Sequence, residues 1–105
     1  FAVILDEVCD ALGVERDAAL GSRRHRQLVL ARSLAIYLAR DLTTLSFPEL
    51  AREMSRSNHS TIVTAWQRAS EQLKAGRLVR LPGQSQPVAI GDLIEQLRRR
   101  VIAAA

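Results

Sequence analysis

Residues 46–69 read Ser-Phe-Pro-Glu-Leu-Ala-Arg-Glu-Met-Ser-Arg-Ser-Asn-His-Ser-Thr-Ile-Val-Thr-Ala-Trp-Gln-Arg-Ala. The stretch begins with a helix-start signal, because Ser46 is followed three residues later by Glu49. A Ser and a Glu at this spacing form a capping box, in which each side chain accepts a hydrogen bond from the backbone N–H of the other. Pro48 falls in the first turn, where its missing N–H costs nothing.

A second helix is expected after a short polar turn at residues 55–57. Asn58 is a favourable N-cap for this helix. Its apolar residues recur at helical spacing until Gly76 and are Ile62, Ala65, Trp66, Ala69 and Leu73. At this spacing we expect Trp66 to be a core residue rather than a platform for base stacking. The two helices together predict a helix-turn-helix over about residues 46–75.

The first residues of the second helix have side chains that suit base edges. In helix-turn-helix proteins this part of the second helix reads DNA. Asn58 can form hydrogen bonds with adenine. His59 can donate to a base acceptor or contact a thymine methyl group, and Ser60 can hydrogen-bond to either a donor or an acceptor on a base edge. Thr61 lies where helix N–H groups favour a phosphate. The alternative remains open that Asn58 is only a cap and His59 an ordinary surface histidine.

A second signal is the arginine-rich segment 23–40, which contains no acidic residue. The whole chain has 15 Lys+Arg against 11 Asp+Glu, a net charge of +4, and only Lys74 among its basic residues is a lysine. Arginine favours bidentate contacts with phosphate and guanine. Net charge alone would favour a solvated basic surface, but the two signals together indicate binding to duplex DNA.

Helical patterns also cover most of the remaining chain. We expect helices over about residues 4–12, 15–20 and 27–42, with 22–26 as a basic connector. Residues 77–91 contain two prolines and a Pro-Gly pair, which predict an irregular excursion or a short hairpin.

The last expected helix covers residues 92–103, starting from a capping box of Asp92 and Glu95. The predicted fold class is all-α, a compact helical bundle containing a helix-turn-helix. The length of 105 residues suits a single DNA-binding domain over 1–105.

Enzyme chemistry has little support in the sequence. The two histidines, His25 and His59, have no Cys or carboxylate at a metal-ligand spacing, and we expect no catalytic and no metal-binding residues. Cys9 is alone, which rules out an internal disulfide. There is no glycine-rich phosphate loop and no apolar run long enough for a membrane, so we expect neither a small-molecule substrate nor a membrane partner.

Two blocks of the chain carry a resemblance to a known family. They are Ala-Ile-Tyr-Leu-Ala-Arg-Asp-Leu-Thr-Thr-Leu-Ser-Phe-Pro-Glu-Leu at 35–50 and Asn-His-Ser-Thr-Ile-Val-Thr-Ala at 58–65. Both resemble the C-terminal DNA-binding domain of the bacterial chromosomal replication initiators of the DnaA family, and the resemblance covers roughly residues 3–75. The family's Phe-Gly-Gly-Arg is replaced by Met-Ser-Arg-Ser at 54–57, and its Asp by Asn58.

The resemblance implies a role for individual residues. The implied base contacts are Asn58, His59, Ser60 and, in the minor groove, Arg24. The implied backbone contacts are Thr61, Arg32 and Arg40, together with Arg23, Arg26 and Ser46. It further implies double-stranded DNA and other copies of the full-length initiator as partners, in the bacterial cytoplasm at the nucleoid. No cofactor is expected in this chain, since ATP would bind an ATPase region outside it.

An alternative stays open beside origin-site recognition. The chain can be a divergent helix-turn-helix paralogue, acting as a transcriptional regulator or as a protein-interaction module. A DNA reader must keep Arg24, Arg32 and Arg40 on one face with the second helix. An interaction module would instead show an exposed apolar patch.

Overall fold

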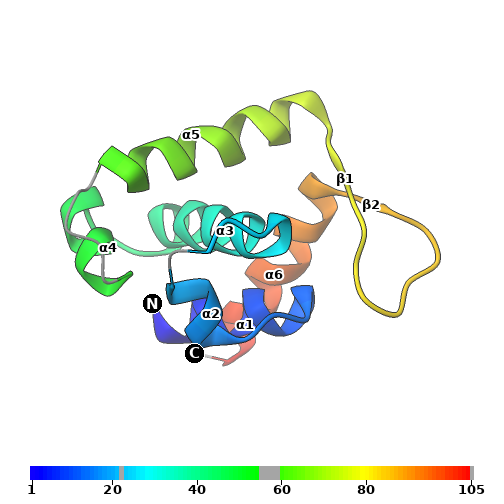
Figure 1. Cartoon of the computed structure of the whole chain (residues 1–105), viewed down its shortest axis with the longest axis horizontal. Helices are drawn as coiled ribbons and strands as arrows, with labels where there is room; N and C mark the ends of the chain where they lie inside the picture. The colour runs from blue at the N-terminus through cyan, green and yellow to red at the C-terminus, as the bar shows by residue number, and fades with distance from the viewer. Residues whose placement is uncertain (22, 55–59, 105) are drawn as a thin grey trace.

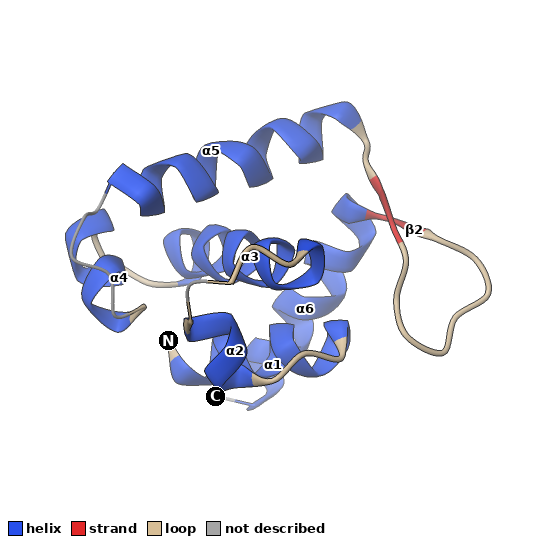
Figure 2. Ribbon diagram, viewed as in Figure 1, coloured by secondary structure: helices blue, strands red, loops and turns tan. Residues whose placement is uncertain are grey.

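Six helices and two short strands are formed by the residues that the computed structural model describes, which are 1–21, 23–54 and 60–104 (Figure 2). In chain order the elements are α1 (Ala2–Leu12), α2 (Arg16–Leu20), α3 (Arg26–Leu42), α4 (Phe47–Glu53), α5 (Ser60–Ala75), β1 (Leu78–Val79), β2 (Val88–Ala89) and α6 (Ile90–Ala104). The predicted all-α class is confirmed.

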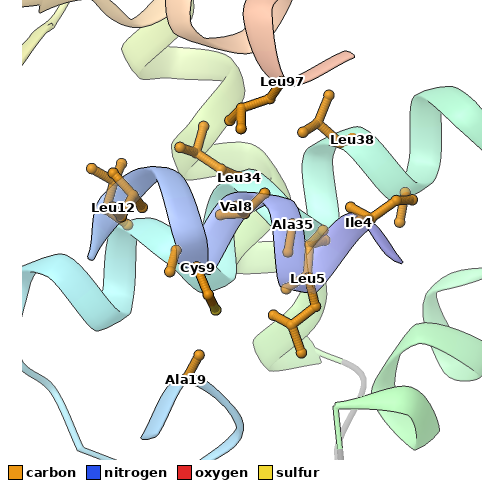
Figure 3. Close-up of a cluster of buried hydrophobic side chains, with 14 of the residues drawn as sticks. Ile4, Leu5, Val8, Cys9, Leu12, Ala19, Leu34, Ala35, Leu38 and Leu97 are labelled. Carbon is orange, nitrogen blue, oxygen red and sulfur yellow. The ribbon is translucent and has the colours of Figure 1, made fainter. Parts of the chain in front are cut away.

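The long helix α3 is the centre of the arrangement. It packs against α1, α2, α5 and α6, and α5 runs across it at the top of Figure 1. Large side chains of α1, α3 and α6 fill the core between them, among them Leu5, Leu34 and Leu97 (Figure 3). Burying one such side chain contributes roughly 1.5–3 kcal/mol, so this three-helix core supplies most of the driving force for folding.

Glycines follow three of the described helices, and two of these glycines have a left-handed backbone. Gly13 follows α1 with φ 68°, and Gly76 follows α5 with φ 67°. This left-handed backbone is strained for residues with a Cβ, and it turns the chain so that N–H groups bond back to the last carbonyls. At α1, the N–H groups of Gly13 and Val14 donate to the carbonyls of Asp10 and Cys9 at 3.3 and 3.0 Å.

The first helix of the predicted helix-turn-helix begins with the expected capping box. The Glu49 N–H donates to Ser46 Oγ at 3.2 Å, and the Ser46 N–H donates to Glu49 Oε1 at 3.1 Å. These bonds satisfy two of the N–H groups that a helix start leaves unpaired. The predicted turn, 55–57, lies outside the described residues.

The segment 77–91 contains a two-stranded antiparallel hairpin, which is the second of the two expected forms. β1 pairs with β2 so that Leu78 faces Ala89. The loop between the strands extends from the right of the molecule in Figure 1. It contacts the helical body near Gly13, where a Cβ would lie 2.8 Å from Pro82 Cγ.

The expected start of the last helix is wrong. α6 begins at Ile90, so Asp92 lies inside the first turn instead of capping it. The Ile90 N–H donates to the Arg77 carbonyl at 2.8 Å. The hairpin thus supplies the hydrogen bond at this helix start, and the local Asp92–Glu95 signal is overridden.

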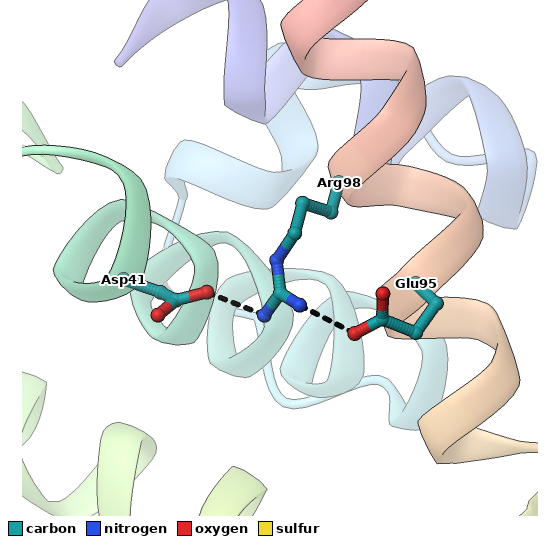
Figure 4. A network of polar contacts seen from close by, with 3 residues as sticks. All are labelled: Asp41, Glu95 and Arg98. Carbon is teal, nitrogen blue, oxygen red and sulfur yellow. Dashed lines mark hydrogen bonds and ion pairs between the residues drawn. The ribbon is translucent and has the colours of Figure 1, made fainter.

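Farther along α6, Arg98 donates hydrogen bonds to Asp41 at the end of α3 and to Glu95 of its own helix (Figure 4). Its side chain is 28% exposed, which places the ion pairs at the edge of the core. They connect the last helix to the central one.

Candidate nucleic-acid interface

The start of α5 carries two of the residues predicted to contact DNA, Ser60 and Thr61. Ile62 and Ala69 are the only fully buried residues of this helix, and eight of its 16 residues are exposed. Ser60 and Thr61 are exposed at its start, and no acidic residue lies in its first turn. Asn58 and His59, the other two predicted base readers of this segment, lie outside the described residues.

A depression of about 560 Å³ runs between α3 and α5 beside this helix start. Its lining residues are Arg24, Val29, Arg32, Ser33, Ile36, Met54, Ser60, Thr61, Thr64, Ala65 and Arg68. Arg24, from the basic connector, therefore lies on the same surface as Ser60 and Thr61. The structure brings together residues that are more than thirty positions apart in the sequence.

Arg32 also lines the depression, but its guanidinium is engaged by the backbone. Nε donates to the Ala19 carbonyl at 2.6 Å, and the two terminal nitrogens donate to the carbonyls of Ala18 at 3.2 Å and Arg23 at 2.6 Å. The Ala18 carbonyl also accepts from the Gly21 N–H at 3.1 Å, so Arg32 adds to the hydrogen bonds that close the end of α2. Arg32 thus joins α2 to the basic connector that carries Arg24.

Arg40 is not among the residues that line the depression. Its guanidinium lies 4.3 Å from the centre of the Phe47 ring and donates to the Leu45 carbonyl at 3.1 Å. Phe47 in turn meets Trp66 edge-to-face, with ring centroids 6.0 Å apart. Trp66 is partly buried and packs against the core, as its spacing predicts. Arg40 is exposed at this aromatic junction of α3, α4 and α5.

The remaining predicted contacts are divided between the surface and the helix ends. Arg23 and Arg26 are exposed, and Arg26 is the first residue of α3 instead of part of the connector. Ser46 is partly buried, and its oxygen accepts the capping bond of α4. To contact the DNA backbone, Ser46 would have to donate its hydroxyl proton to a phosphate oxygen.

Sequence reasoning missed two residues of this surface, Thr64 and Arg68. Both line the depression and are exposed. The signal was present in the sequence, because Ser60, Thr64 and Arg68 follow one another at steps of four and share one helix face. Thr64 donates its hydroxyl proton to the Ser60 carbonyl at 3.0 Å.

Among the described side chains, those of Glu49 and Cys9 have perturbed pKa values, and neither lines the depression. The backbone hydrogen bond from Ser46, followed by that from its side chain, lowers the pKa of Glu49. Burial raises the pKa of the Cys9 thiol, with a smaller contribution from the negative charge of Asp6. Over the described ranges, no group of three or more His, Cys, Asp or Glu side chains could hold a metal ion. No helix in the described part of the chain has the length and apolar character needed to cross a membrane.

Comparison with known proteins identifies the family. Residues 1–69 match the family described as bacterial dnaA protein helix-turn-helix. The chain belongs to this family. It is also similar to two proteins named chromosomal replication initiator protein DnaA, with 35% identity over 69 residues for that of a Synechococcus species and 36% over 76 residues for that of Thermus thermophilus.

A third DnaA, from Caldanaerobacter subterraneus subsp. tengcongensis, matches over 99 residues at 27% identity. The three matches cover 66%, 72% and 94% of this chain, but only 15%, 17% and 20% of the relatives. The chain therefore corresponds to a small part of each initiator. The DnaA resemblance and the helix-turn-helix prediction are confirmed.

Proposed function

We propose that this chain binds double-stranded DNA in a sequence-specific manner, as the origin-recognition module of a DnaA-like replication initiator. The observation that carries the proposal is the surface shared by Arg24 and the start of α5. A helix N-terminus with small polar side chains fits the major groove, and an arginine beside it fits the adjacent narrow minor groove. Membership of the DnaA helix-turn-helix family supports the same reading.

In this proposal, specificity comes from Asn58, His59, Ser60 and Arg24, and position comes from contacts with the phosphates. Base contacts distinguish sequences, whereas phosphate contacts fix register and orientation. The proposed phosphate contacts are Thr61, Arg32, Arg40, Arg23, Arg26 and Ser46. Arg32 remains positively charged while it donates to its three carbonyls, so its guanidinium attracts a phosphate from this position.

The full-length initiator would act in the bacterial cytoplasm, with ATP bound outside this chain and further initiator copies at neighbouring sites. A protein-interaction module is less well supported. The large hydrophobic residues exposed in the described ranges are Val3, Leu78 and Ile102, which lie on α1, β1 and α6. None of them lines the depression beside α5.

The experiment is a binding titration of the 105-residue chain against a duplex carrying a bacterial DnaA origin site and against the same duplex scrambled. We expect the origin duplex to bind more tightly, typically by a factor of 10³ or more at physiological salt. His59→Ala should weaken the origin complex by about 1–3 kcal/mol and leave the scrambled complex almost unchanged. Equal affinity of the wild-type chain for both duplexes would reduce the function to generic electrostatic binding.

A further inference from the structure

A second depression continues the first one toward the far end of α5. Its volume is about 360 Å³, and it shares four lining residues with the first depression: Arg24, Val29, Ser33 and Arg68. The other lining residues are Arg26, Leu30, Gln72 and Arg77. On α5 the polar stripe at steps of four thus extends from Ser60 to Gln72. We name this second depression the arginine cleft.

The charge of the arginine cleft has one sign. Four arginines line it, Arg24, Arg26, Arg68 and Arg77, and its described lining contains no acidic residue. Within the described part of the chain, the ion pairs involve other arginines, namely Arg16, Arg98 and Arg100. Four unneutralised cations at one cleft repel one another and attract an anion.

Among the described residues, the floor of the cleft contains one unpaired donor, which suits an anion, and one unpaired acceptor, which does not. Ser33 is 1% exposed and lines both depressions. Over the described residues, its Oγ and the Oε1 of Gln72 are buried without a hydrogen-bond partner. Buried polar atoms normally have partners, supplied by protein, water or ligand. The Ser33 hydroxyl can donate to an anion oxygen or to a water that bridges to it.

Arg77 is held in place by the backbone on both sides. Its N–H donates to the Gln72 carbonyl at 3.1 Å, and its carbonyl accepts from the Ile90 N–H at 2.8 Å. The residue therefore joins the end of α5 to the start of α6. It lies beyond residues 1–69, so the family match does not include it. α5 extends about 22 Å from Ser60 to Ala75, at 1.5 Å per residue, and Arg77 lies just beyond its end.

We propose that the arginine cleft binds a backbone phosphate of DNA flanking the base pairs read by the start of α5, with Arg77 and Arg26 as the principal donors. The proposal rests on the proposed function, because it takes duplex DNA as the source of the phosphate. The distance along α5 exceeds the roughly 12 Å width of the major groove. In the proposed function the start of α5 points at the base edges, so the far end of the helix lies beyond the groove that receives Ser60, and the phosphate belongs to the flanking duplex.

The test compares Arg77→Ala with Arg80→Ala in the 105-residue chain. Arg80 is exposed on the same hairpin and does not line the cleft, so its removal changes the net charge equally. Affinity for a scrambled duplex is measured by fluorescence anisotropy over a range of salt concentrations. Each lost phosphate contact should reduce the slope of log K against log salt by about 0.9. We expect this reduction for Arg77→Ala and for Arg26→Ala, and none for Arg80→Ala.

A second arm uses origin duplexes that keep the site but differ in flank length. The loss of affinity caused by Arg77→Ala should disappear when the flank that carries the phosphate is removed. Thermal melting shows whether each variant is folded. If Arg77→Ala does not fold, Arg26→Ala still tests the proposal.

The outcomes separate the two proposals. Two results would overturn the proposed phosphate site in the arginine cleft: an unchanged salt slope for Arg77→Ala and Arg26→Ala, or equal reductions of the slope for Arg77→Ala and Arg80→Ala. Either result would do so even if the wild-type chain binds the origin duplex more tightly than the scrambled one. A slope reduced only in the two cleft variants would support the cleft even if the wild-type chain failed to prefer the origin duplex.

Discussion

At the scale of single residues, the hydrogen-bond partners of Arg32 differ from those that its position in the sequence suggests. On the sequence it is one of several arginines on a helix face, available to phosphates. In the structure its guanidinium donates to three backbone carbonyls, of Ala18, Ala19 and Arg23. Because Arg23 precedes Arg24, these bonds hold the segment that brings Arg24 to the start of α5.

This geometry predicts the effect of Arg32→Lys. Lysine keeps the charge but has a single donor group, so it cannot bind three carbonyls in a fork. We expect the free energy of unfolding to fall by about 1–3 kcal/mol in urea denaturation. We also expect Arg24→Ala to weaken DNA binding less in the Arg32→Lys background than in the wild-type chain.

The matched control is Arg52→Lys, at an exposed position on α4. If Arg32 acted only as a positive charge toward phosphate, Arg32→Lys would preserve both stability and the full effect of Arg24→Ala. Such additivity of the two variants would refute the positioning role of Arg32.

At the scale of elements, the start of α4 depends on the ionised form of Glu49. Two hydrogen bonds connect Ser46 and Glu49, and the carboxylate accepts one of them. This contact lowers the pKa of Glu49 in the folded chain. A carboxyl with a lowered folded pKa stabilises the fold above its unfolded pKa of about 4.3, and this contribution is lost as pH falls through the folded pKa.

We therefore predict that Glu49→Gln destabilises the chain at pH 7, and that the wild type and the variant converge in acid. Urea denaturation at pH 7 and at steps below pH 4 measures the difference in free energy of unfolding. Glu53→Gln removes an exposed carboxylate from the same helix and serves as the control. A Glu49→Gln difference that stays constant down to pH 2 would show that the charge of Glu49 has no part in the cap.

The same scale shows how far the sequence could predict the molecule. The Ser46–Glu49 cap and the Gly76 stop were predictable, because the interacting groups lie within a few residues of one another. The predicted helix start at Asp92 was wrong because the Ile90 N–H donates to the Arg77 carbonyl, a backbone group distant in the sequence. The spacing places Arg68 on the same helix face as Ser60, but whether this face borders α3 and Arg24 depends on how α5 packs across α3, and this is not a local property.

At the scale of the whole molecule, one core connects the elements that form the proposed interface. The radius of gyration is 12.7 Å, close to the roughly 13 Å expected of a domain of about 100 residues. α3 carries the floor of both depressions on one side and buries Leu34 and Leu38 on the other. The relative position of Arg24 and α5 therefore depends on the integrity of this core.

Cys9 lies inside that core at 4% exposure, and it is the only cysteine in the chain. Its single thiol can serve as a built-in reporter of global opening, without any engineered label. A thiol reagent should modify the native chain more slowly than the denatured chain by a factor on the order of a thousand or more, since only opened molecules react. Bound duplex should slow the modification further, whereas Arg32→Lys should speed it up. Modification of native and denatured chains at similar rates would show that the core opens locally around Cys9.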